Sequence, residues 1–154
     1  MTETTLRVSK IKDGTVIDHI NNGHALDVVR ILGINGQTNG TVLIALHVPS
    51  KQLGLKDIVK VEGRELKPEE VDKIALLAPH ASINIIRQYT VVDKKRVKLP
   101  GIISGTVRCG NPVCVSNSSE PIQPKFYVMK EDPLVVRCHY CSHIMERQEI
   151  LRQF

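Results

Sequence analysis

All four cysteines of this 154-residue chain lie in its last third, and this clustering constrains the fold more than any other feature. The spacing is Cys109-x4-Cys114, then 23 residues, then Cys138-x2-Cys141. Two short loops that each offer two thiolates can be brought together by the strands between them, which is the ligand pattern of a tetrahedral Zn²⁺ site. We therefore expect one zinc ion held by these four cysteines.

The alternatives are two disulfides or four unrelated thiols. We place the chain in the cytoplasm, because its first ten residues lack the apolar segment of a signal peptide, and thiols stay reduced there. Iron in a four-thiolate site stays open, since ligand type alone does not separate it from zinc. Four thiolates complete the shell, so we expect neither His139 nor His143 to be a ligand and we expect the metal to be structural.

The charged run "DKKRVKLP" is the best candidate for a domain boundary. We predict a first domain at residues 1–92, a linker at 93–100 and a zinc-binding domain at 101–154. A domain of about 54 residues buries too little apolar surface to fold without a cross-link, and the metal would supply one.

Periodicity in the first domain alternates between strand and helix. Helical spacing of apolar residues predicts helices at 24–33 and 67–79. Short β-branched or alternating runs predict strands at 6–11, 14–20, 41–48, 57–63 and 82–92. The order predicts an α+β fold, a ferredoxin-like βαββαβ domain with one antiparallel sheet and two helices on one face.

The second domain is expected to be small and β-rich. Short β-like runs occur at 105–109, 125–129 and 134–138, separated by turn-rich segments. The pattern does not decide between helix and strand for the final residues, 149–154.

Charge and motifs argue against several function classes. The net charge is +5, but most of the excess lies in the run at 93–100, and the chain has only three tyrosines and two phenylalanines, so we expect no nucleic-acid partner. No apolar stretch reaches the roughly 18 residues that a membrane span needs. A nucleophile elbow, a phosphate-binding glycine loop and an H-E-x-x-H motif are all missing, so we do not expect an enzyme. Asp18 and His19 are adjacent on a strand and should point to opposite faces, which would prevent joint acid–base catalysis.

Three cationic side chains sit on or next to predicted strands. His19, Lys60 and Lys94 could converge on a polyphosphate. The alternative is that each lysine is simply a solvated charge at a strand edge.

Particular stretches resemble the family of aspartate carbamoyltransferase regulatory chains. They are "GTVIDHI" from Gly14, "KDIVKVEG" from Lys56, "LAPHASINIIRQYTVV" from Leu77, and the four-cysteine spacing. The resemblance implies a noncatalytic subunit whose N-terminal domain binds the effectors CTP, ATP or UTP and forms a homodimer. It also implies that the zinc domain docks on the catalytic chain, with six chains of each kind, and that CTP inhibits the first committed step of pyrimidine biosynthesis.

The resemblance also assigns roles to single effector-binding residues. Asp18 would accept hydrogen bonds from the ribose hydroxyls, and His19 would lie near the phosphates. Lys60 would reach the base and ribose, and Lys94 would hold phosphate. The chain departs from the family at residues 2–10, so the resemblance does not predict which nucleotide is preferred.

Four further positions follow from the same resemblance. Ile11 and Tyr89 lie where the family surrounds the base with backbone. Asn111 and Glu120 match positions that contact the catalytic chain, whereas Val113 replaces a polar residue there. The four cysteines match the family's zinc ligands.

Overall fold

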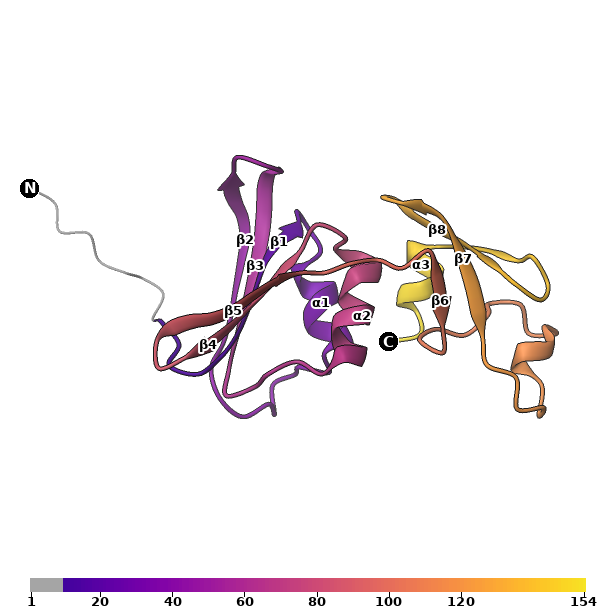
Figure 1. Cartoon of the computed structure of the whole chain (residues 1–154), viewed down its shortest axis with the longest axis horizontal. Coiled ribbons are helices and arrows are strands. Elements are labelled where there is room, and N and C mark those ends of the chain that lie inside the picture. The colour runs from indigo at the N-terminus through magenta and orange to yellow at the C-terminus, as the bar shows by residue number, and fades with distance from the viewer. Residues whose placement is uncertain (1–9) are drawn as a thin grey trace, which may run out of the picture.

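The computed structural model describes residues 10–154, which form two lobes joined by an extended segment (Figure 1). The elements of the first lobe are β1 (Gly14–Asn21), α1 (Ala25–Ile31), β2 (Val42–Ser50), β3 (Gly54–Glu62), α2 (Pro68–Leu77), β4 (Ser82–Arg87) and β5 (Thr90–Arg96). They form one antiparallel sheet in the order β2-β3-β1-β4-β5. The expected ferredoxin-like arrangement is confirmed, with β5 added at one edge.

Both helices of the first lobe lie on the face of the sheet that is turned toward the second lobe (Figure 1). The core between them buries Ile17 of β1 and Val59 of β3 against Val28 of α1 and Ile74 of α2. The neighbouring positions, such as Asp18 and Lys60, point to the opposite face because successive side chains of a strand alternate. The other face of the sheet is therefore free to carry charged side chains.

The N-cap residue of helix α1, His24, makes no side-chain capping hydrogen bond. The fully buried Asp57 of β3 accepts the hydrogen bonds at the start of the helix instead. Its Oδ2 accepts hydrogen bonds from the N–H groups of Gly23 at 2.9 Å and Ala25 at 3.1 Å, and its Oδ1 accepts from the N–H of His47 at 3.1 Å. One carboxylate thus joins the start of α1 to two strands.

The single long strand predicted at 82–92 is wrong. The chain reverses at Gln88 and Tyr89, whose φ angles of 50° and 63° make the tight two-residue turn between β4 and β5. Strand β5 continues to Arg96 and so takes in the first residues of the predicted linker at 93–100. The strand expected at 6–11 falls largely outside the described residues.

The second lobe is a four-stranded antiparallel sheet in the order β6-β7-β8-β9, flanked by a short helix. Its elements are β6 (Ile102–Ser104), a 3-10 turn (Val115–Asn117), β7 (Lys125–Glu131), β8 (Leu134–Cys138), β9 (Ile144–Glu146) and α3 (Arg147–Leu151). The strand expected at 105–109 is wrong, because pairing with β7 ends at Ser104. Of the undecided residues at 149–154, the first three form the end of α3 and the rest lie beyond it. No helix within residues 10–154 is long and apolar enough to cross a membrane.

Replacing Asp57 by alanine should lower the free energy of unfolding of the first lobe by about 3 kcal/mol or more, because buried N–H groups would lose their acceptor. Urea unfolding followed by circular dichroism would measure the change. The matched control is Glu65→Gln, which removes an exposed ion pair with Arg87 and should cost less than about 1 kcal/mol. Equal effects of the two substitutions would contradict the capping role.

Candidate metal centre and effector-binding face

The four cysteines converge at one point of the second lobe. Their sulfur atoms all lie within 4.8 Å of one another, although 24 residues of sequence number separate Cys114 from Cys138. The first pair comes from the loop after β6, and the second pair from the end of β8 and the turn that follows. All four are free thiols in the structure.

The distances between sulfur atoms match a tetrahedral thiolate site. Cys109 Sγ lies 3.6 Å from Cys141 Sγ, and Cys114 Sγ lies 3.7 Å from Cys138 Sγ. A zinc ion bound at 2.3 Å to each sulfur places neighbouring sulfurs about 3.8 Å apart. A disulfide needs sulfurs at about 2.05 Å. The cluster therefore fits one zinc ion as a closed, structural site and does not fit two disulfides.

The surroundings shift the pKa values of three of the four cysteine thiols. Burial raises the pKa of the Cys109 and Cys138 thiols. Burial acts in the same direction on Cys141, but hydrogen bonds from the His143 backbone and the Asn111 side chain outweigh it and lower the pKa of Cys141 to about 6. Zinc binds cysteine as the thiolate, so metal binding at this cluster would release the thiol protons.

Both histidines near the cluster have other partners. The Nδ1 of His139 lies 2.5 Å from the hydroxyl of Tyr127, and the Nε2 of His143 lies 3.1 Å from Glu149 Oε1. These contacts turn the imidazoles toward the lobe's polar groups and leave the four sulfurs as the donor set of the cluster.

The open face of the first sheet carries a row of paired residues that includes both predicted lysines. Lys60 of β3 pairs with Val16 of β1, Val16 pairs with Asn84 of β4, and Asn84 pairs with Lys94 of β5. Directly opposite residues in antiparallel strands share a face. Lys60 and Lys94 therefore point to the same side of the sheet, away from the helices.

A second row adds residues that the sequence did not suggest. Asp18 pairs with Ser82, and Ser82 pairs with Arg96. A hollow of about 160 Å³ lies over this row and is lined by His19, Gln52, Ser82, Lys94 and Arg96. Lys94 and Arg96 are two residues apart and so share a face of β5, which could have pointed to Arg96. The segment was interpreted as a linker, so this spacing was not used.

The expectation that Asp18 and His19 point to opposite faces is wrong. His19 has a φ of 56°, and the pairing of β1 with β3 shifts between Ile17 and Ile20. This bulge re-aims the side chain, as bulges do. His19 Nδ1 lies 3.0 Å from Ser82 Oγ and 4.0 Å from Asp18 Oδ1, so both residues serve the open face.

Asp18 already has a cationic partner. Lys56 Nζ lies 3.0 Å from Asp18 Oδ1 and 3.2 Å from Oδ2, and both side chains are largely buried. Lys56 is thus a further member of the cationic group that sequence reasoning missed. The group now comprises His19, Lys56, Lys60, Lys94 and Arg96, with Asp18 as its one carboxylate.

Ile11 and Tyr89 lie together at the opposite end of β1. The N–H of Tyr89 donates to the carbonyl of Lys12, the residue after Ile11, at 2.9 Å. Four residues of strand separate this end, at Gly14, from Asp18, or about 13 Å. The open face can therefore hold an elongated ligand with an uncharged end near Tyr89 and an anionic end near Arg96.

The predicted docking residues belong to the first cysteine loop and the segment after it. Asn111 is half-buried and helps to build the loop, since its Oδ1 accepts from the N–H of Val113 at 3.2 Å and its N–H lies 3.5 Å from Cys109 Sγ. Glu120 is exposed, and Val113 has 88% of its surface exposed.

Comparison with known proteins covers nearly the whole chain. Residues 6–98 match the family model of the aspartate carbamoyltransferase regulatory chain, allosteric domain, and residues 101–151 match that of the metal binding domain. Proteins named aspartate carbamoyltransferase regulatory chain are similar: one from Pyrococcus abyssi is 58% identical over 95% of this chain and 96% of its own length. Others come from Methanothrix thermoacetophila, 57% identical over 92% of each chain, and Methanothermobacter thermautotrophicus, 51% identical over 97% and 95%.

Removing the metal should unfold the second lobe and leave the first folded, because the small core of the second lobe depends on the cross-link. Amide hydrogen exchange after chelation should show lost protection at residues 125–150 and kept protection at 14–87. Cys114→Ser should give the same pattern and bind less than one zinc ion per chain.

The control for this experiment is Ser116→Ala, which removes a hydroxyl 3.2 Å from Cys114 Sγ but keeps all four sulfurs. It should retain one zinc ion and full protection. A second lobe that stays protected after thorough chelation would contradict the structural role of the metal.

Proposed function

Because the chain belongs to the family of aspartate carbamoyltransferase regulatory chains, we propose that it is the noncatalytic subunit that binds nucleotide effectors and docks on the enzyme's catalytic chain. The observation that carries the proposal is the pairing of a cationic open sheet face in the matched allosteric domain with a closed four-thiolate cluster in the matched metal binding domain. The regulated step is the first committed reaction of pyrimidine biosynthesis, in the cytoplasm.

The effector is a nucleoside triphosphate, CTP or ATP, with UTP as a further candidate. Lys94, Arg96 and His19 surround a hollow that suits the phosphates, since cationic groups bind phosphate oxygens through charge-assisted hydrogen bonds. Asp18 accepts from ribose hydroxyls, and Lys60 reaches the ribose and base. The base lies toward Ile11 and Tyr89, where backbone groups read its edge.

The N-terminal domain forms a homodimer through the edge strand β2. The two edges of the sheet differ, because β5 carries Lys94, Lys95 and Arg96 whereas β2, from Val42 to Ser50, has no lysine, arginine or acidic residue. Charged edge strands resist pairing with another chain. Ile44 and Leu46 of β2 are both exposed, which supports β2 as the paired edge.

The zinc domain docks on the catalytic chain through the first cysteine loop. Val113 is an apolar side chain held almost fully in solvent by a loop that the metal makes rigid, and Glu120 and Asn111 lie nearby in sequence. A rigid loop loses little conformational entropy when it binds a partner. Six such chains with six catalytic chains would complete the assembly.

Lys94→Gln should weaken CTP binding by about tenfold or more, because it removes a charge-assisted contact to phosphate. Isothermal titration of the purified chain with CTP would measure the affinity. Lys95→Gln is the matched control: Lys95 pairs with Ile83 and so lies on the other face of β5. Its affinity should stay within twofold of that of the unchanged protein, and equal losses in the two variants would contradict the assignment of the open face.

Val113→Asp should prevent stable assembly with the catalytic chain while the zinc content stays at one ion per chain, because a charge would enter an apolar contact. Size-exclusion chromatography with the catalytic chain would detect the loss. Met129→Asp, at another exposed apolar position of the second lobe, is the control and should assemble. Assembly of Val113→Asp at unchanged strength would remove this loop from the docking surface.

A further inference from the structure

The contact between the two lobes has an apolar part that holds them together. Leu76 of α2 is buried in the core of the second lobe, and Leu99 of the connecting segment packs against the cores of both lobes. Apolar burial has no preferred direction. This part of the contact therefore joins the lobes without fixing how one is turned relative to the other.

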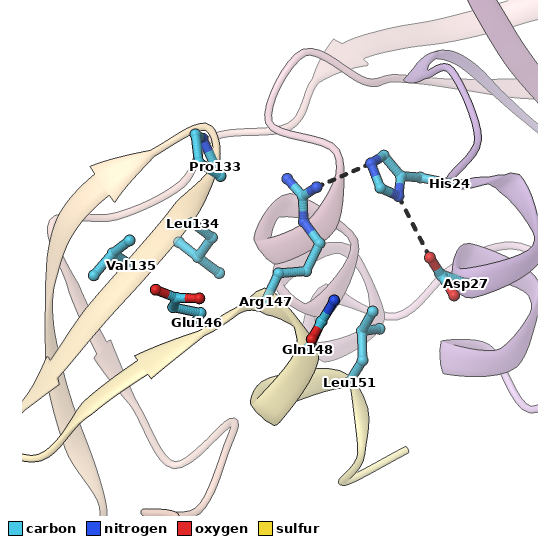
Figure 2. Close-up of a pocket in the computed structure, with 9 residues that line it drawn as sticks. All are labelled: His24, Asp27, Pro133, Leu134, Val135, Glu146, Arg147, Gln148 and Leu151. Atoms are coloured by element: carbon cyan, nitrogen blue, oxygen red, sulfur yellow. Dashed lines mark hydrogen bonds and ion pairs between the residues drawn. The ribbon is translucent and has the colours of Figure 1, made fainter.

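The polar part of the same contact is directional. Arg147, the first residue of α3, has its Nη1 2.9 Å from His24 Nε2 (Figure 2). Its Nη2 donates to Asp132 Oδ1 at 3.3 Å. Asp132 Oδ2 accepts from Asn21 Nδ2 at 3.2 Å. Two residues of the first lobe thus meet two of the second, and we call Asn21, His24, Asp132 and Arg147 the interdomain clamp.

The clamp requires a neutral His24. A guanidinium group has no acceptor, so His24 Nε2 must accept from Arg147 and its Nδ1 must carry the proton. That Nδ1 lies 3.4 Å from Asp27 Oδ2, which is placed to receive it (Figure 2). Hydrogen bonds of this kind weaken steeply when their angles change, so rotation of the lobes would break them.

Helix α1 also holds the other end of α3. Arg30 donates through Nη2 to the carbonyl of Leu151 at 2.6 Å and through Nε to the carbonyl of Phe154 at 3.0 Å. Leu151 is the last residue of α3, and its carbonyl also accepts from the N–H of Phe154 at 3.2 Å. With His24 at the start and Arg30 at the end of α1, movement of α1 must carry α3 along.

The clamp is incompletely satisfied in the observed arrangement. Arg147 Nε and Asn21 Oδ1 are buried, and neither has a partner among residues 10–154. A cavity of about 490 Å³ beside Arg147, lined also by His24, Leu134 and Leu151, leaves room for the guanidinium to re-aim (Figure 2). Buried unpaired polar groups disfavour the arrangement that contains them. Re-aiming of Arg147 within this cavity would change the polar contact between the lobes.

The effector-binding residues and the clamp share one short segment of chain. Asp18 and His19 are followed after one residue by Asn21, the last residue of β1, and then by His24. Lys56, the partner of Asp18, precedes Asp57, whose carboxylate holds the turn at Gly23. Two short connections therefore link the open face to the clamp. One is the chain itself, and the other is the hydrogen bond from the Gly23 N–H to Asp57.

We propose that residues 18–24 carry the effector signal to the zinc module by shifting the interdomain clamp, so that Asn21, His24, Asp132 and Arg147 act as positioning residues for coupling and not for binding. The proposal rests on the proposed function. A nucleotide that engages Asp18 and His19 competes with the Lys56 ion pair and moves the end of β1. A ligand shifts the equilibrium between two clamp arrangements because it binds one of them more tightly than the other.

Two clamp variants test this proposal in the assembled enzyme. Arg147→Met keeps the aliphatic stem and removes the guanidinium, and Asp132→Asn keeps the shape of the side chain and removes its charge. In both, the affinity of the regulatory chain for CTP should stay within twofold, while the factor by which CTP changes the activity of the complex should fall to less than half. Arg152→Met, an exposed arginine of the same C-terminal region outside the clamp, is the control and should keep the full response.

Zinc content and chromatography establish whether each variant assembles. If Arg147→Met fails to assemble, Asp132→Asn provides the test. An unchanged CTP response in an assembled clamp variant that binds CTP normally would overturn the inference alone. Failure of the unchanged protein to bind CTP would overturn the proposed function and the inference with it.

Discussion

The four-thiolate cluster is the constraint on which the second lobe depends. Apart from its cysteines, the core of that lobe consists of a few large side chains, chiefly Phe126, Leu134, Val136, Met145 and Ile150, and it is completed by Leu76 from the first lobe. A core of this size does not offset the conformational entropy of about 50 ordered residues. The metal closes the loop between Cys114 and Cys138, and the loop around Val113, which we propose as the docking surface, is held by the same closure.

In the first lobe, one face of the sheet packs against the helices and the other face is open. The alternation of β1 and β3 places Ile17, Val59 and Val61 under the helices and leaves Lys60 and Val16 on the open face. A bulge at His19 breaks that alternation at one point and brings an imidazole to the face that already holds Lys94 and Arg96. The irregularity adds a polar side chain to the open face, while the neighbouring core residues Ile17 and Ile20 stay fully buried.

Much of this structure was predictable from local patterns, and the failures have identifiable causes. The cysteine spacing predicted the cluster, and the periodicities around Val28 and Ile74 predicted both helices, because these signals are local and redundant. The hairpin at Gln88 and Tyr89 was missed because neither residue is the glycine or asparagine that such a turn usually contains. The same holds for His19, which has a positive φ although it is neither glycine nor asparagine.

The contact between the lobes was beyond sequence reasoning altogether, since Arg147 meets His24 across 123 residues of sequence number. Its composition nevertheless suits a regulatory chain. Net hydrogen-bond contributions are about 1 kcal/mol each, and allosteric coupling typically amounts to about 1 to 3 kcal/mol. A contact made only of buried leucines would be too insensitive to orientation to carry such a signal, and a buried, fully satisfied polar network would be too costly to rearrange. The proposed clamp consists of a few directional hydrogen bonds and so lies between these limits, in the range that a ligand with different affinities for two states can shift.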